Sequence, residues 1–304
     1  MDGILAVWKP EGWTSHDVVA KVRRVLKMKR IGHTGTLDPM VTGVLPLCLG
    51  RATRVVEYVQ ERPKSYEAVL QLGIATDTED ITGTVIARQS PISVTEEDVR
   101  HTLSQFIGEI DQVPPMYSAV KVDGKRLYEL AREGKTVERK SRKVTIHQID
   151  LIDTQLDLDL PQISFSVVCS KGTYIRTLCV DIGKALGVPA TMAHLTRTMS
   201  GGITKESCLT LEQIEQLQQS GELSGHIISA DEAVTHLDRV TIPESFGKLA
   251  LQGQKVSLSH SIEHAALTLD GQLIRLYNDQ SSFLGIFQID LNANVFKPIK
   301  VFSA

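Results

Sequence analysis

Apolar residues along the chain follow two patterns: continuous or alternating runs, and spacings of three or four residues. The runs predict buried strands at residues 3–7, 66–72 and 163–168. The wider spacing predicts helices at residues 14–26 and 95–107, each opened by a threonine with an aspartate three positions later, as in a capping box. Strands interleaved with helices and hairpins predict an α+β core with a mixed sheet.

Two connections within this core are predicted from turn residues. The run at residues 83–87 follows an acidic turn, so we predict that it pairs with the strand at residues 66–72. The strand at residues 163–168 leads through a short polar turn into a helix, which places Tyr174 and Arg176 at a strand-to-helix junction.

A β-rich tail follows the core. The acidic, irregular stretch around residues 231–238 marks a boundary, and Asp270-Gly271 gives a strong hairpin signal beyond it. We therefore expect two domains, residues 1–238 and a small β-barrel at residues 239–304. Strands of the tail are predicted at residues 266–269, 273–276, 283–289 and 295–301.

Composition sets limits. The chain has 304 residues, 42% of them hydrophobic, and a formal net charge of -3, which argues against binding nucleic acid by bulk charge. The four cysteines lack zinc-site spacing, and the glycines lack P-loop or dinucleotide-binding spacing, so we expect no metal and no nucleotide cofactor. Without a leader pattern or about 18 uninterrupted apolar residues, we expect a cytoplasmic protein with no membrane partner.

Basic residues gather in two segments, residues 21–30 and 121–143. A charge run is most often a solvated face, but the first segment leads directly into a glycine-rich loop. The second is long and polar, with a short helix predicted to end near Gly134. Because such segments attract phosphates, we interpret the second as an RNA-gripping insertion near residues 121–147.

The glycine-rich loop holds a single carboxylate, Asp38. Pro39 disfavours helical torsions at Asp38, and Gly32, Gly35 and Gly43 permit turns that bulkier residues resist. An isolated Asp-Pro pair is most often an ordinary turn. Flanked by basic residues, this one suggests a carboxylate held in a defined direction and aimed at an anionic partner.

The whole run GHTGTLDPMVTGVLPLCLGRATR, residues 32–54, resembles the catalytic motif of the TruB family of tRNA pseudouridine synthases. KPEGWTS, the Tyr66 strand with Gly73, PPMYSAVK and GTYIRTL resemble further family motifs in the same order. The resemblance implies isomerisation of the uridine at position 55 in the TΨC loop of tRNA, by base flipping, glycosidic bond cleavage and reattachment through C5. It also implies a pseudouridine synthase core with a mainly antiparallel sheet, a PUA-like C-terminal domain, a monomer, and neither metal nor cofactor.

The same resemblance implies that Asp38 is the catalytic aspartate, that Arg176 pairs with it, and that Tyr66 stacks on the target uracil. An arginine partner would lower the pKa of the aspartate and fix its direction. Asp38 must be ionised whether it attacks the sugar, attacks the base or removes a sugar proton, and the sequence leaves these roles open. Taken alone, Arg176 would be a surface residue and Tyr66 would belong to the core.

Five further residues have substrate-binding roles by resemblance. His33 occupies the space that the flipped nucleotide vacates, Tyr174 lies against the site, and Asp80 contributes hydrogen bonds. Lys9 and Leu195 are neighbours of the pocket. Each has a structural alternative, such as a polar loop residue for the histidine and a turn residue for the aspartate.

Two other functions compete with the enzymatic hypothesis. A non-catalytic tRNA-binding or tRNA-folding protein would use the same basic segments without chemistry. An aspartate-dependent nucleoside hydrolase would share the sugar chemistry but release free uracil. The intact GHTGTLDP run with Arg176 favours the isomerase over the first, and the basic segments imply a larger anionic partner than the second requires.

Overall fold

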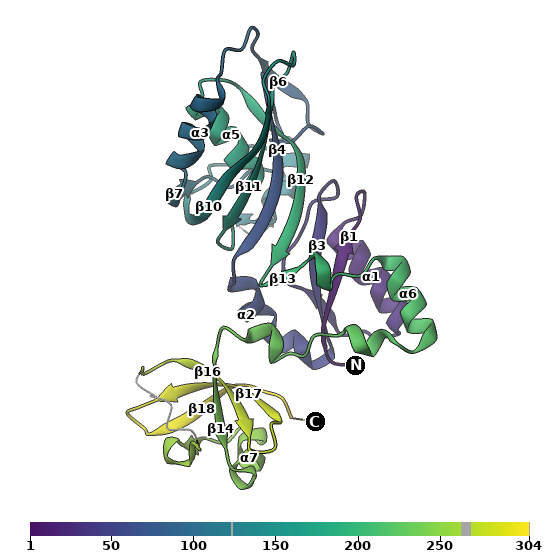
Figure 1. Ribbon diagram of the computed structural model, residues 1–304, viewed down its shortest axis with the longest axis vertical. Helices are drawn as coiled ribbons and strands as arrows, with labels where there is room; N and C mark the ends of the chain where they lie inside the picture. Colours follow the sequence, from purple (N-terminus) through teal and green to yellow (C-terminus); the bar gives the residue numbers. More distant parts are fainter. Residues whose placement is uncertain (123, 263–268, 304) are drawn as a thin grey trace.

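The computed structural model describes residues 1–122, 124–262 and 269–303. It consists of a large part built on a long, curved sheet and a smaller sheet formed by the C-terminal residues (Figure 1). Within the described residues, no helix is long and apolar enough to cross a membrane.

The large sheet runs in the order β1-β3-β12-β4-β11-β10-β7, with β2 added beside β3 and β13 beside β12. All of its pairings are antiparallel except that of β12 with β3, so the expectation of a mixed, mainly antiparallel sheet is confirmed. Its strands are β1 (Gly3–Lys9), β2 (Ile31–His33), β3 (Thr42–Leu49), β4 (Lys64–Leu72), β7 (Gly108–Gln112), β10 (Arg142–Gln155), β11 (Gln162–Cys169), β12 (Ala190–Ser200) and β13 (Ile203–Thr204).

The parallel β3–β12 pairing divides this sheet into two halves. It consists of two residue pairs, Thr196 with Thr42 and Arg197 with Gly43, and the two threonine hydroxyls lie 3.0 Å apart. Gly43 has a φ of +116°, and a Cβ there would lie 2.2 Å from the backbone oxygen of Arg197. Only glycine therefore allows the two strands to approach this closely.

The helices α3 and α5 lie against one half of the large sheet, α1 and α6 lie side by side next to β1, and α7 lies on the C-terminal sheet (Figure 1). Thr14 and Thr95 form the predicted capping boxes with Asp17 and Asp98, so both helix starts are confirmed. The helices are α1 (Ser15–Leu26), α2 (Val56–Glu61), α3 (Glu96–Gln105), α4 (Leu127–Arg132), α5 (Ile175–Ala185), α6 (Leu211–Ser220) and α7 (Glu244–Leu251).

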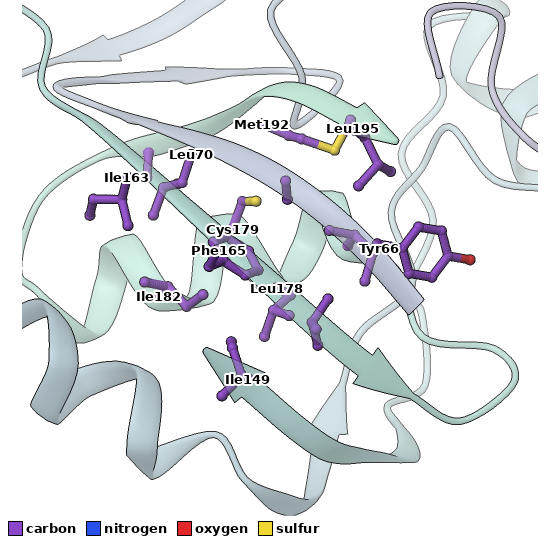
Figure 2. Packing of buried hydrophobic residues seen from close by; sticks show 14 of the residues in the cluster. Tyr66, Leu70, Ile149, Ile163, Phe165, Leu178, Cys179, Ile182, Met192 and Leu195 are labelled. Atoms are coloured by element: carbon purple, nitrogen blue, oxygen red, sulfur yellow. The ribbon is translucent and has the colours of Figure 1, made fainter. Parts of the chain in front are cut away.

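The largest apolar cluster lies between α5 and the central strands (Figure 2). Phe165 of β11 and Leu178 and Ile182 of α5 are fully buried within it. Each such side chain contributes about 1.5–3 kcal/mol relative to an exposed one. Tyr66 lies at one end of the cluster, and its hydroxyl points away from the apolar residues (Figure 2). Packing in this cluster thus holds β4 in place, the strand that carries Tyr66.

The predicted hairpin between residues 66–72 and 83–87 is wrong. β6 (Val85–Arg88) pairs with β5 (Ile74–Thr76), whereas both edges of β4 are occupied by β11 and β12. All four residues of β6 are exposed, so it has no apolar face for the central sheet. Proximity in sequence suggested the partner, but burial of β4 required two more apolar strands.

The predicted insertion extends too far. β8 (Lys121–Val122), β9 (Lys125–Arg126) and α4 form a small separate unit, but residues 142–146 belong to β10 and pair with β7 in the large sheet. Val144 and Ile146 are buried there. Their alternation was hidden in a string of basic residues, which is why the sequence did not indicate a core strand.

The C-terminal sheet runs in the order β14-β16-β17-β18-β15 and packs around its own apolar cluster with α7. The predicted strands at residues 273–276, 283–289 and 295–301 are confirmed, while residues 266–268 of the other lie outside the described residues. Closure into a barrel and the domain boundary after residue 238 stay predictions. The strands are β14 (Asp238–Ile242), β15 (Val256–Ser257), β16 (Leu273–Asn278), β17 (Phe283–Asp290) and β18 (Val295–Val301).

Candidate active site

A cavity of about 1110 Å³ opens beside the junction of the two half-sheets. Its lining comes from the start of α1, the β2–β3 loop, β4, the β5–β6 turn, α4 with the segment before it, the start of α5 and the second half of β12. Segments distant in sequence therefore meet at one site. Of the predicted site residues, the lining includes Asp38, Arg176, Tyr66, His33, Tyr174, Asp80 and Leu195.

Ser15, the first residue of α1, anchors the loop that carries Asp38 through hydrogen bonds to Leu37. The Ser15 hydroxyl accepts a hydrogen bond from the Leu37 amide at 2.9 Å and lies 3.3 Å from the Leu37 carbonyl oxygen, to which it can donate. After the aspartate, the Val41 amide donates to the Asp38 carbonyl at 3.0 Å and closes a turn. These bonds leave the carboxylate facing the cavity.

Lys9 lies behind this loop, and the described cavity lining does not include it. Its side chain is fully buried, and its ammonium donates to the carbonyls of Pro10, Trp13 and Pro39. Burial lowers the pKa of Lys9 to about 8. All three donors of the buried ammonium are taken up by carbonyl oxygens, so Lys9 supports the loop through the Pro39 carbonyl, directly after Asp38. Its substrate-binding role stays a prediction.

Arg176 is the second residue of α5, and its side chain is 7% exposed. Nη2 lies 3.0 Å from Oδ2 of Asp38 and donates to the Tyr117 carbonyl at 2.7 Å. Nη1 donates to the Thr78 carbonyl at 3.1 Å and lies 3.8 Å from Oδ2 of Asp80. The guanidinium is thus fixed by two carbonyls and presented to the aspartate loop.

Asp80 is a buried second carboxylate on the far side of Arg176. Its Oδ1 accepts hydrogen bonds from the hydroxyls of Thr78 at 2.8 Å and Thr82 at 2.5 Å, and from the Thr82 amide at 3.0 Å. Oδ2 is left facing the guanidinium. The carboxylate therefore orients Arg176 rather than opening directly onto bulk solvent.

Burial and neighbouring charges together set the pKa of Asp38. Burial within the cavity wall raises it, the charge of Arg176 lowers it, and the charge of Asp80 raises it, with a net shift above the ordinary value of 3.8. Arg176 lowers the pKa as predicted, but desolvation of the carboxylate outweighs this effect, so the net shift is upward. Sequence spacing carried no information about that desolvation.

The raised pKa predicts an acid limit on turnover. If ionised Asp38 is the active form, the active fraction falls as pH drops through its pKa, and a raised pKa moves this loss to higher pH. We expect single-turnover rates on bound tRNA to decline with a midpoint above 3.8, the ordinary value for an aspartate. A midpoint at or below that value, with the protein folded throughout, would contradict the assignment.

Tyr66 and Leu195 approach the cavity from neighbouring strands, β4 and β12. The β4–β12 register shifts on either side of residues 194–197, so β-bulges flank the segment that delivers Leu195. Bulges commonly re-aim side chains beside functional sites. The Tyr66 ring is nearly buried, and burial raises the pKa of its hydroxyl.

His33 and Tyr174 lie at the cavity wall. Contacts of the ring hold His33, and hydrogen bonds of the backbone hold Tyr174. Nδ1 of His33 accepts from the Gly35 amide at 3.3 Å, the ring meets His16 edge-on, and burial lowers the His33 pKa, which favours neutral imidazole. The Gln112 side chain accepts from the Tyr174 amide at 2.7 Å and donates to its carbonyl at 3.0 Å. This pair of bonds positions the start of α5.

Sequence reasoning missed several polar residues of the site. Arg197 is buried and reaches the cavity, and the Thr34 and Ser118 hydroxyls are buried in the lining without a partner among the described residues. Thr34 and Ser118 belong to the quoted motifs GHTGTLDP and PPMYSAVK, so membership of those motifs was their available signal. Arg197 follows Leu195 by two residues on a strand, and that alternation could have placed both on one face.

Basic side chains form a rim around the mouth of the cavity. Arg126 and Arg132 flank the Tyr128 ring, with guanidinium carbons 5.8 and 5.5 Å from its centroid. Lys121 and Lys171 add further charge to the lining. Cations around an aromatic ring suit a phosphate backbone with unstacked bases. Across the described part of the chain, no three or more histidine, cysteine, aspartate or glutamate side chains gather as a candidate metal site.

Comparison with protein families gives two adjoining matches. Residues 23–175 match the model of the TruB family pseudouridylate synthase N-terminal domain, and residues 176–235 match that of the tRNA pseudouridylate synthase B C-terminal domain. The junction falls at Arg176, so the two matched regions supply the two partners of the central ion pair.

Similar proteins and structures agree with this match. The chain is 45% identical to tRNA pseudouridine synthase B of Clostridium perfringens strain 13 over 95% of this chain and 96% of that one, and 42% identical to the protein of that name in Geobacillus thermodenitrificans over 99% and 100%. A Cbf5-Nop10-Gar1 complex superposes with a TM-score of 0.75 at 28% identity, covering 99% of this chain and 84% of that chain. Matched over nearly its whole length, the chain belongs to the TruB family of pseudouridylate synthases.

Proposed function

We propose that the protein converts uridine to pseudouridine at position 55 in the TΨC loop of tRNA. The observation that carries the proposal is the pairing of Asp38 with buried Arg176 at 3.0 Å inside a cavity ringed by basic side chains. The names of the relatives, tRNA pseudouridine synthase B, support tRNA as substrate.

The proposed reaction is an isomerisation in which all atoms balance. The N1–C1′ bond of uridine breaks, the uracil turns, and a C5–C1′ bond forms; the proton lost from C5 is matched by the proton gained at N1. Asp38 acts ionised, by attack on the sugar, by attack on the base or by removal of a sugar proton. The fixed guanidinium of Arg176 holds the carboxylate in place and stabilises its charge.

Access to the base requires the nucleotide to leave its stack. Extrusion costs a few kcal/mol, which stacking and phosphate contacts offset. We propose that Tyr66 provides the stacking surface, with Leu195 beside it, and that His33 fills the vacated space in the RNA loop. Tyr174 and Asp80 order Arg176, and Lys9 supports the aspartate loop.

The proposed enzyme works as a monomer. Since the reaction is redox-neutral and rearranges bonds within one nucleotide, it calls for no redox cofactor and no nucleotide cofactor. The mass of the purified protein in solution, measured by light scattering with and without tRNA, tests the oligomeric state. A dimeric mass at working concentration would contradict this part of the proposal.

The decisive experiment uses unmodified tRNA transcript tritiated at uracil C5. We expect tritium release with one pseudouridine mapped at position 55, and no release from a matched transcript with cytidine there. Free uracil would indicate a nucleoside hydrolase. Tight tRNA binding without release would support the non-catalytic tRNA-binding alternative and overturn the proposal.

The basic rim predicts salt-dependent tRNA binding. We expect an Arg126→Gln, Arg132→Gln double variant to bind tRNA about tenfold more weakly at low salt, with the salt slope reduced by roughly 0.7–0.9 for each phosphate that is no longer neutralised. The rate on fully bound tRNA should change little. Arg100→Gln with Lys184→Gln is the matched control, since these exposed residues form surface ion pairs outside the cavity. Equal weakening by the control would contradict the rim assignment.

A further inference from the structure

Arg197 is the largest fully buried side chain in the described structure, with 1% of its surface exposed. It lines the cavity, yet among the described residues no carboxylate lies within ion-pair distance of its guanidinium. A buried cation is costly unless its donors are matched by well-placed acceptors. The location of these acceptors therefore indicates the role of the residue.

The acceptors of Arg197 lie on two segments, the aspartate loop and β3. Nε donates to the Val44 carbonyl of β3 at 2.7 Å, and Nη2 donates to the Gly35 carbonyl at 3.1 Å. Gly35 is three residues before Asp38 in the same loop. One planar guanidinium thus ties the aspartate loop to the strand that follows it.

The same side chain faces Tyr66. Arg197 is the direct cross-strand partner of Tyr66 in the β4–β12 pairing, and the positive charge of Arg197 lowers the pKa of Tyr66 against the larger effect of burial. Residues directly opposite on antiparallel strands have Cβ atoms about 4.5–5.5 Å apart. Arg197 is thus opposite Tyr66 in the sheet and is hydrogen-bonded to the loop of Asp38 at Gly35.

We propose that Arg197 is a positioning residue that fixes the Asp38 loop relative to the Tyr66 ring, acting through the Gly35 carbonyl and the Tyr66 side chain and not through the substrate. This inference rests on the proposed function for its consequence, but its structural part concerns the loop alone. The planar guanidinium of arginine can donate hydrogen bonds to several acceptors in fixed directions. The ammonium of lysine carries the same charge but cannot reproduce that arrangement of donors.

The test compares Arg197→Lys with Lys64→Met in the full-length protein. Lys64 is the control because it is also a buried cation in the lining, two residues before Tyr66, but its ammonium donates to the Gln60 and Arg62 carbonyls and to no carbonyl of the aspartate loop. Its stem lies beside Gly35, and methionine retains a stem of similar length there. Hydrogen–deuterium exchange at residues 34–41 reports loop order without any turnover, since the Thr34, Leu37 and Val41 amides are hydrogen-bonded.

We expect Arg197→Lys to speed exchange at residues 34–41 by about tenfold or more and to lower the single-turnover rate by about 10- to 100-fold, the scale of a small misplacement at a reacting centre. Binding of tRNA should change less than threefold. Lys64→Met should leave exchange of the loop unchanged. Combined with Tyr66→Phe, Arg197→Lys should show a non-additive loss of rate, and Lys64→Met an additive one.

Unchanged loop exchange in Arg197→Lys would overturn the inference, as would an additive loss with Tyr66→Phe. Failure of Arg197→Lys to fold would also overturn it, because the residue would then be required for the core rather than for the site. If wild-type protein releases no tritium, the proposed function fails, while the exchange measurement still decides whether Arg197 orders the loop.

Discussion

Asp38→Asn is expected to lower the single-turnover rate by at least about 10⁴-fold, the scale seen when a reacting side chain is removed from an enzyme. Asparagine preserves the shape of the carboxylate, so the loop bonds at Leu37 and Val41 should persist. The amide, however, is a poor nucleophile and a poor base, and it cannot balance the charge of Arg176. Turnover should therefore disappear while the fold remains.

Binding distinguishes this result from misfolding. The affinity of Asp38→Asn for tRNA should stay within about threefold of wild type, because phosphate contacts dominate nucleic-acid affinity and the basic rim is untouched. Asp150→Asn is a suitable control, since Asp150 is exposed on β10 and outside the cavity lining. Rates within tenfold of wild type for Asp38→Asn would remove Asp38 from the centre of the mechanism.

Arg176→Met is expected to lower the rate by about 10³-fold and to lower the free energy of unfolding by about 3 kcal/mol, the usual cost of removing one partner of a buried ion pair. Without the guanidinium, buried Asp80 loses its cation and the Tyr117 and Thr78 carbonyls lose their donors. The acid limit on turnover should also move to higher pH, since the Arg176 charge lowers the Asp38 pKa.

Two related variants sharpen this expectation. Arg176→Lys retains the charge but not the paired donors, so its pH limit should lie nearer that of wild type, although its rate stays low. Adding Asp80→Asn to Arg176→Met removes the stranded carboxylate and should restore part of the lost stability, measured by denaturant unfolding. If the double variant were as unstable as the sum of the single changes, the proposed coupling between Arg176 and Asp80 would be wrong.

Features encoded by neighbouring residues could be predicted from the sequence. The capping boxes at Thr14 and Thr95 depend on residues three positions apart, and the Asp38 loop and the Arg176 junction each lie within one short motif. Resemblance then connected these motifs to one site. The structure brings Asp38 and Arg176 within hydrogen-bonding distance, although they are 138 positions apart.

Features that depend on long-range packing could not be predicted. The partners of β4 are β11 and β12, both far along the chain, and no local pattern specifies them. Lys9 has a motif position that suggests substrate contact, but its orientation depends on which carbonyls surround it after folding. The net pKa of Asp38 likewise depends on desolvation by residues from several segments.

The short parallel pairing between β3 and β12 has a mechanical consequence. Asp38 is connected to the half-sheet of β3, whereas Tyr66 and Arg176 are connected to the half-sheet of β4, and two residue pairs form the seam between them. A change of twist at this seam would change the distance between Asp38 and the residues of the other half-sheet. The Asp38–Arg176 ion pair and the hydrogen bonds of the Arg197 guanidinium connect the two half-sheets and oppose such a change. An RNA loop that contacts both half-sheets would restrict their relative motion further when it binds.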